Sequence, residues 1–362
     1  MQYKVIGLMS GSSLDGLDIA YVQFEETAGK WQFELLESAC APYSPEWKKK
    51  LSASAALTAK EYLLLHTEYG HYLGKCVNRF QQEKNLAFRV QLIASHGHTA
   101  FHLPGRLMTA QLGDGAAIAS ETGIRTITDL RSMDIAFGGQ GAPIVPIGEK
   151  LLFPEFDLFL NIGGIANLSA NRPEFIGFDV CPANRILNLL AADTEKGFDV
   201  NGELAAAGQT DENLLRQLNT FPYYQMPFPK SLSNEFGLKE VLPLLIEANL
   251  SMPDALRTYS QHIADQISKS ILNLKKEFPE KENLRLLMTG GGVHNRFLVN
   301  SIRERVLSGG IECIIPSESL ADYKEALVIA LMGVLRWRED INVMHSVTGA
   351  SKDSINGAVW SV

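Results

Sequence analysis

Three glycine-bearing segments carry groups that suit phosphate chemistry. They read GSSLDG (11–16), NIGGIAN (161–167) and TGGGVHN (289–295). Backbone N–H groups and hydroxyls suit phosphate oxygens, and a carboxylate suits Mg²⁺, usually through water, which makes Asp15 the metal candidate. The nucleotide-binding candidates are Gly11, Ser12, Ser13, Leu14, Asp15, Gly16, Leu17, Asp18, Gly163, Gly164, Gly290, Gly291, Gly292 and Asn295.

Each segment also has an ordinary structural explanation when it is taken alone. GSSLDG lacks the P-loop pattern and joins a strand to a strand, so neither a P-loop nor a dinucleotide fingerprint is indicated. A hairpin turn needs Gly and Asp for backbone reasons alone, and NIGGIAN is compatible with a bulged hairpin. TGGGVHN is compatible with a closely packed loop before a helix. Together the three segments predict a nucleotide held between two domains.

An acidic residue that follows the second glycine segment is the candidate general base. GFDVCPAN (177–184) places Asp179 at the end of a short strand. The carboxylate could accept a proton from an attacking nucleophile near the γ-phosphate, or it could serve only as a turn or helix N-cap residue. The pattern alone leaves both readings open.

Further polar side chains suggest a sugar-binding region. SHGHTAFH (95–102) follows a buried strand, and His96 is expected to hydrogen-bond sugar hydroxyls; a metal hydrolase that uses His96 and His98 is the alternative. Arg131 and Asp134, in the stretch 131–146, could reach a polar ligand. Glu325 opens the last apolar helix and is relevant only if that helix starts near the ligand; otherwise it is a surface acid.

Composition excludes several classes of protein. The chain has 362 residues, 46% hydrophobic and 20% charged, with a formal net charge of −8, which argues against nucleic-acid or anionic-membrane surfaces. Its four cysteines are far apart and no secretory signal is visible, so we expect a cytoplasmic protein. The longest apolar segment, 326–335, is about half a membrane span.

The elements that would position these residues alternate between strands and helices, which favours an α/β fold. A hairpin is expected over 3–24 and a second strand–turn–strand unit over 156–170, which suggests an internal duplication. The expected helices cover 59–84, 112–122, 254–278 and 321–340, the expected strands include 90–97 and 124–129, and strand–helix units cover 177–192 and 284–307. Two domains are expected: 1–132, completed by 341–362, and 133–340.

The order of these motifs resembles the anhydro-N-acetylmuramic acid kinase family, within the superfamily of sugar kinases, actin and heat-shock chaperones. The resemblance rests on MSGSSLDGLDIA, HGHT, GGQGAPIVP, NIGGIAN, KGFDVNGELAAAG, FPKS, TGGGVHN, the KEAL helix and the terminal VTGA, in one colinear order. It implies a two-domain, ribonuclease H-like actin/sugar-kinase fold with a nucleotide cleft between the lobes.

The resemblance also implies a reaction. ATP and water would act on 1,6-anhydro-N-acetylmuramic acid, opening the anhydro ring and phosphorylating O6, to give N-acetylmuramic acid 6-phosphate and ADP in cell-wall amino-sugar recycling. The family's base falls on Asp179, with Mg²⁺ and ATP as cofactors. Residues implied near the sugar are His96, Arg131, Asp134, Asn184 and Glu325.

The chain departs from the family pattern at a few positions. Val180-Cys181-Pro182-Ala183-Asn184 stands where Thr-Gly-Pro-Gly-Asn is common, and HGHT stands where HGQT is usual, so the pocket's sugar selectivity is where a difference is expected. The alternatives are a kinase of another anhydro- or amino-sugar and a non-catalytic nucleotide-binding module. The apolar face of 321–340 is compatible with a homodimer.

Overall fold

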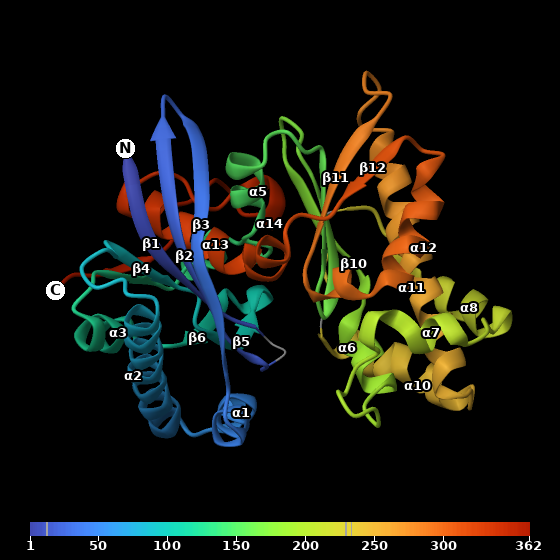
Figure 1. Ribbon diagram of the computed structural model, residues 1–362, viewed down its shortest axis with the longest axis horizontal. Helices are drawn as coiled ribbons and strands as arrows, with labels where there is room; N and C mark the ends of the chain where they lie inside the picture. Colours follow the sequence, from blue (N-terminus) through green and yellow to red (C-terminus); the bar gives the residue numbers. More distant parts are fainter. Residues whose placement is uncertain (12–13, 229, 233) are drawn as a thin grey trace. The chain divides into compact units, whose positions relative to one another are not determined.

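The computed structural model describes residues 1–11, 14–228, 230–232 and 234–362, and they form two compact units (Figure 1). Unit 1 comprises Met1–Phe153 and Tyr323–Val362, and unit 2 comprises Pro154–Asp322. These bounds differ from the expected ones, because residues 133–153 and 323–340 pack with unit 1 rather than with the second lobe.

Unit 1 is built on a six-stranded sheet in the order β13-β7-β4-β1-β2-β3. β1 pairs antiparallel with β2 and β2 with β3, whereas β1, β4 and β7 run parallel. The strands are β1 Gln2–Ser10, β2 Gly16–Thr27, β3 Lys30–Pro42, β4 Leu92–Ser95, β7 Thr126–Thr128 and β13 Ala358–Trp360. The hairpin β1–β2 was expected from the sequence, but β3 was not, because this edge strand has no fully buried residue to reveal a pattern.

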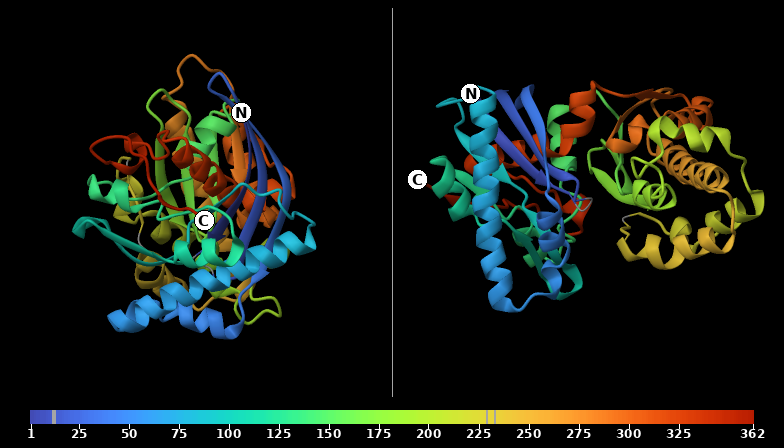
Figure 2. Two further views of the ribbon diagram at one scale, coloured as in Figure 1. Left: turned by 90° about the vertical axis from the view of Figure 1, so that its left-hand side faces the viewer. Right: turned by 60° about the horizontal axis from the view of Figure 1, so that its bottom comes forward.

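Helices cover both faces of this sheet (Figure 2). α2 (Ala59–Glu83) begins at a capping box formed by Thr58 and Glu61 and packs with α3 (Gly115–Thr122) on the face that carries Ile6 and Leu8. α13 (Glu318–Trp337) lies against the opposite face of β1. The smaller elements are α1 Pro45–Ser52, η1 Ser54–Ala56, β5 His98–Leu103, η2 Pro104–Arg106, β6 Met108–Leu112, α4 Ser132–Ala136, α5 Pro146–Leu152 and α14 His345–Thr348.

The contact between β1 and α13 requires a glycine. A Cβ on Gly7 would lie 1.9 Å from the carbonyl oxygen of Ala326, so the helix backbone approaches the strand directly. Every residue from Ala326 to Leu335 is buried. The apolar face that had suggested a dimer therefore belongs to the core of unit 1. Within the part of the chain that the structure describes, no helix is long and apolar enough to cross a membrane.

Unit 2 repeats the plan with a five-stranded sheet in the order β10-β9-β8-β11-β12. The strands are β8 Leu158–Ile162, β9 Ile165–Ala170, β10 Ile176–Pro182, β11 Leu284–Thr289 and β12 Ile311–Ile314. The helices are α6 Asn184–Leu190, η3 Val200–Gly202, α7 Glu203–Ala207, α8 Glu212–Asn219, η4 Pro222–Gln225, α9 Asn234–Phe236, η5 Gly237–Val241, α10 Leu242–Glu247, α11 Met252–Lys275, η6 Gly291–His294 and α12 Arg296–Leu307.

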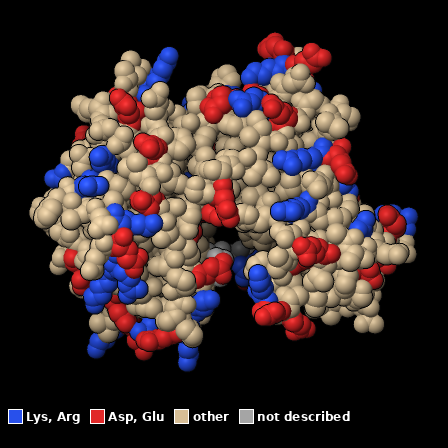
Figure 3. Space-filling view, viewed as in Figure 1, with Lys and Arg blue, Asp and Glu red and all other residues tan. Residues whose placement is uncertain are grey.

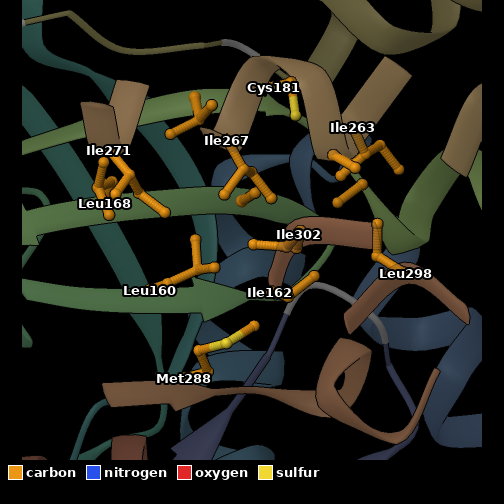
Figure 4. Close-up of a cluster of buried hydrophobic side chains, with 14 of the residues drawn as sticks. Leu160, Ile162, Leu168, Cys181, Ile263, Ile267, Ile271, Met288, Leu298 and Ile302 are labelled. Carbon is orange, nitrogen blue, oxygen red and sulfur yellow. The ribbon is translucent and has the colours of Figure 1, made fainter. Parts of the chain in front are cut away.

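The core of unit 2 lies between its sheet and the helices α11 and α12 (Figure 4). Ile263, Ile267 and Ile271 follow one face of α11 and pack with Leu160 of β8 and Leu168 of β9. The spacing of the isoleucines is that of an amphipathic helix, which is why this helix could be predicted from the sequence.

The two sheets share one topology. In unit 2, and in the first five strands of the unit 1 sheet, three antiparallel strands come first in the chain and two strands parallel to the first of them follow, in the spatial order third, second, first, fourth, fifth; unit 1 adds β13, antiparallel to β7, at the edge. This confirms the duplication and the two-unit ribonuclease H-like, actin/sugar-kinase fold expected from the sequence. Basic and acidic side chains are interspersed on the visible face of both units (Figure 3), in keeping with the modest net charge.

Candidate active site

The first glycine segment forms the β1–β2 turn of unit 1. Ser10 pairs with Leu17 at the end of the hairpin, and Asp15 is exposed; Ser12 and Ser13 lie outside the described residues. A Cβ on Gly16 would lie 2.5 Å from Sγ of Cys40, so glycine here is explained by the close approach of β3. Burial and the neighbouring Asp18 raise the pKa of Cys40 to about 12, which keeps this thiol protonated.

A chain of hydrogen-bonded hydroxyl groups lies at the end of β1, where this turn begins. Tyr43 Oη donates to Ser10 Oγ at 2.8 Å and lies 2.6 Å from Tyr69 Oη, and Ser10 Oγ lies 3.4 Å from Nδ1 of His98. Because Tyr43 uses its proton on Ser10, Tyr69 is the donor to Tyr43, and Ser10 is free to donate to His98. Burial lowers the pKa of His98 to about 4, so this ring is neutral at neutral pH.

His96 and Arg131 form the central polar pair of unit 1. The Nε of Arg131 donates to Nε2 of His96 at 2.8 Å, while Nδ1 of His96 lies 2.8 Å from the Gly97 carbonyl oxygen. Burial and the Arg131 charge lower the pKa of His96 to about 3, so the ring is neutral with its proton on Nδ1. Burial lowers the pKa of Arg131 to about 10, with Glu325 and Asp134 acting in the opposite direction.

Asp134 lies near Arg131, but both of its carboxylate oxygens accept hydrogen bonds from the protein. It is fully buried; Oδ1 accepts from Thr348 Oγ1 and Oδ2 accepts from the Gly141 N–H, both at 2.7 Å. The Gly141 carbonyl in turn accepts from Arg131 at 2.5 Å. The carboxylate therefore anchors the loop that holds the guanidinium.

Asp179 of unit 2 lies within β10 and not at its end as expected, because the strand continues to Pro182 through a β-bulge, where the register shifts between Asp179 and Cys181. Its Oδ1 accepts from Nδ2 of Asn167 and its Oδ2 accepts from the Leu232 N–H at 2.7 Å. Burial raises the pKa of Asp179, and these two hydrogen bonds oppose the rise. A carboxylate with a raised pKa is a stronger proton acceptor than an exposed one.

The second glycine segment lies close to Asp179 in unit 2. The Asn184 side chain donates to the Ile162 carbonyl at 3.1 Å, and its N–H donates to the Gly163 carbonyl at 3.0 Å, so the start of α6 holds the β8–β9 turn. A Cβ on Gly163 or Gly164 would meet nothing closer than 3.4 Å. Packing within the protein therefore does not require these two glycines, which leaves room for a ligand against the backbone.

The third glycine segment divides into two kinds of position. A Cβ would lie 2.4 Å from Asn161 Oδ1 at Gly290 and 2.2 Å from Ile162 Cγ2 at Gly292, so close packing explains both. At Gly291 the nearest atom would be 3.9 Å away. Asn295 caps α12, because its Oδ1 accepts from the Leu298 N–H at 3.0 Å.

The positions that depart from the family pattern point inward. Val180 and Cys181 are 1% and 0% exposed and belong to the hydrophobic core of unit 2. Their side chains therefore contact core residues. Any effect of these two positions on sugar selectivity would have to act through the backbone of the bulge, whereas His98, the departure in HGHT, lies in unit 1 beside Ser10.

The arrangement of the histidines does not resemble a metal centre. Both ring nitrogens of His96 are engaged, one of them by a cation. Among the described residues, no three His, Cys, Asp or Glu side chains lie close enough together to hold a metal ion. A Mg²⁺ that arrives with a nucleotide needs fewer protein ligands, and the exposed Asp15 fits that role.

Several contacts of the site were not assigned from the sequence. Asn167, Tyr223 and Leu232 surround Asp179, and Thr348 binds Asp134. The motifs NIGGIAN and VTGA contain Asn167 and Thr348, and FPKS directly precedes Leu232, so these motifs are the sequence signal that could have identified them. Only strand pairing places Asn167 opposite Asp179, and only tertiary packing brings Tyr223 and Leu232 to it.

Known proteins match this chain over almost its whole length. A family model described as anhydro-N-acetylmuramic acid kinase matches residues 3–362. An anhydro-N-acetylmuramic acid kinase of Pasteurella multocida is 31% identical, covering 98% of this chain and 96% of that protein, and one of Coxiella burnetii is 33% identical, covering 99% and 97%. A solved structure of an activator of 2-hydroxyisocaproyl-CoA dehydratase from Clostridium difficile is 15% identical, with a TM-score of 0.45, and covers 93% of this chain and 96% of that one.

Proposed function

Because the chain belongs to the anhydro-N-acetylmuramic acid kinase family, we propose that Asp179 is the general base of that family's reaction in this protein. The protein is an ATP-dependent kinase, a phosphotransferase with an alcohol group as acceptor. It opens the 1,6-anhydro bridge of anhydro-N-acetylmuramic acid with water and phosphorylates O6. The products are N-acetylmuramic acid 6-phosphate and ADP.

Asp179 accepts the proton of the attacking water. The water oxygen forms a bond to the anomeric carbon as the bond from that carbon to O6 breaks, and the freed O6 attacks the γ-phosphorus of ATP while its bond to the ADP oxygen breaks. The observation that carries this role is the combination of a partly buried carboxylate, a raised pKa and two hydrogen bonds that fix the orientation of the carboxylate.

His96, Arg131 and Glu325 of unit 1 bind the sugar. Arg131 keeps its charge while hydrogen-bonded to two neutral acceptors, so its remaining N–H groups suit an anionic or hydroxyl group of the substrate. Asp134 has both carboxylate oxygens engaged by the protein, and we assign it to positioning Arg131 through Gly141 rather than to contacting the sugar. Asn184 supports the β8–β9 turn.

The glycine segments bind the nucleotide. We assign the segment from Gly11 to Asp18 to the phosphates, with Ser12 and Ser13 outside the described residues, and Gly163, Gly164 and Gly291 leave space for a ligand against the backbone. Gly290 and Gly292 allow the close packing of the third segment, and Asn295 caps the helix that follows it. Mg²⁺ bound to ATP would neutralise phosphate charge, and Asp15 would hold it through water.

Substitution of Asp179 tests the assignment. Asp179→Asn keeps the size of the side chain but replaces one of its two acceptor oxygens with an NH₂ group, and the amide cannot accept a proton from water, so we expect kcat to fall by about 10²–10⁴-fold with nucleotide binding retained. The assay is ADP release with the anhydro-sugar, with mass spectrometry of the product formed in ¹⁸O-water. Incorporation of ¹⁸O by the wild type supports hydrolytic opening; near-normal turnover of Asp179→Asn would remove Asp179 from the base role.

A further inference from the structure

Each oxygen of the Asp179 carboxylate is held by a different segment of unit 2. Asn167 on β9 donates from Nδ2 to Oδ1, and the N–H of Leu232 donates to Oδ2 at 2.7 Å. The main chain of Asp179 is also held, because its N–H donates to the Lys230 carbonyl at 3.1 Å and its carbonyl accepts from Tyr223 Oη at 2.7 Å. The carboxylate cannot rotate without breaking one of its two hydrogen bonds.

Strand register places Asn167 where it is needed. Asn161 of β8, Asn167 of β9 and Asp179 of β10 are direct partners across three neighbouring strands, so their side chains share one face of the sheet at its turn end. Asn167 makes the side-chain contact to the carboxylate, whereas Leu232 contributes its backbone. Of the two donors, only Asn167 can be removed by a substitution that leaves the backbone unchanged.

We infer that Asn167 is a positioning residue for this reaction, which aims the carboxylate of Asp179 and stabilises its negative charge. The inference rests on the proposed role of Asp179 as the base. An amide is suited to this task because it donates a hydrogen bond without adding a charge. A second carboxylate at this position would repel Asp179, and an aliphatic side chain would leave Oδ1 without its donor.

The surroundings of Asp179 allow the effect to be read from a pH profile. Burial raises the pKa of Tyr223 and of Cys181, so neither group ionises in the acidic range. Burial lowers the pKa of Lys230, and this side chain loses its proton on the alkaline side of the pH profile. Among these groups, Asp179 is the one that titrates in acid, so the acid limb of kcat/KM reports its protonation.

The experiment compares the wild type with Asn167→Leu and Asn167→Ala. Values of kcat/KM for anhydro-N-acetylmuramic acid are measured by ADP release from pH 5 to pH 9, and thermal melting checks folding. Loss of a donor disfavours the carboxylate, so the acid limb should move upward by about one pH unit in both variants, with KM for ATP unchanged. If the Leu variant does not fold, the smaller Ala variant supplies the comparison.

Asn171→Ala is the matched control. Asn171 directly follows β9, and its Nδ2 donates to the Phe156 carbonyl at 3.2 Å instead of to Asp179, so its profile should follow the wild type. An acid limb that stays in place in folded Asn167 variants, while Asp179→Asn is inactive, overturns this inference alone. Full activity of Asp179→Asn would instead overturn the proposed function.

Discussion

The Nε of Arg131 donates a 2.8 Å hydrogen bond to Nε2 of His96, so the guanidinium is paired with a neutral imidazole instead of a carboxylate. This geometry depends on the tautomer of His96, whose Nδ1 proton is directed at the Gly97 carbonyl. The second contact of the guanidinium, to the Gly141 carbonyl, is also to an uncharged acceptor. Arg131 is thus oriented by the protein without being neutralised by these two contacts.

Replacing Arg131 by lysine should test this orientation. An ammonium cannot reach both His96 and Gly141 with the geometry of a planar guanidinium, and hydrogen bonds to a charged group contribute about 1.5–3 kcal/mol each. We expect Arg131→Lys to lower kcat/KM for the anhydro-sugar by about 10–100-fold, with KM for ATP little changed. Steady-state kinetics with each substrate varied in turn would check this; an equal loss for both substrates would contradict a sugar-binding role.

The anchoring of Asp134 predicts a difference between two substitutions of Thr348. Thr348→Val is nearly isosteric but removes the 2.7 Å donor to a fully buried carboxylate, which should cost about 1–3 kcal/mol of unfolding free energy and raise KM for the sugar. Thr348→Ser keeps the hydroxyl and should be closer to the wild type in both measurements. Denaturant unfolding and sugar KM provide the comparison; equal behaviour of the Val and Ser variants would argue against this anchor.

A buried histidine of unit 2 predicts how stability depends on pH. His262 is fully buried, with Nδ1 2.7 Å from Asn219 Oδ1 and Nε2 3.0 Å from Tyr224 Oη, and burial lowers its pKa to about 3. The unfolded chain has the ordinary value of about 6.5 and binds the extra proton first, so stability is lost as pH falls below about 6.5.

His262→Gln should reduce that dependence. The change in unfolding free energy with pH should become smaller by up to about 1.4 kcal/mol per pH unit between pH 5 and 6.5, because one proton uptake is removed. Urea unfolding at several pH values in this window would measure the slope. His71→Gln is the control, since His71 is half-exposed and lies on α2 of unit 1. A slope that His262→Gln leaves unchanged would show that His262 does not remain neutral in the folded state.

Part of the candidate site follows from the sequence because local chemistry fixes it. A glycine-bearing turn between two apolar runs already indicates a hairpin. The expectation that Asp179 ends a strand was wrong, because β10 continues through a bulge to Pro182, and a bulge depends on the partner strand. The long helices α2 and α11 could be predicted within a few residues, because their apolar residues recur at helical spacing. Strand β3 could not, since an edge strand without fully buried residues lacks that pattern.

The sequence alone therefore determined the succession of strands, turns and helices and the types of the reactive side chains, because those depend on neighbours along the chain. Only the tertiary structure decided which groups meet. It set Asn167 opposite Asp179 through strand register, joined Asp134 to Thr348 over more than two hundred residues, and buried the 326–335 helix face in unit 1. Such contacts depend on packing between distant segments, which residue spacing does not encode.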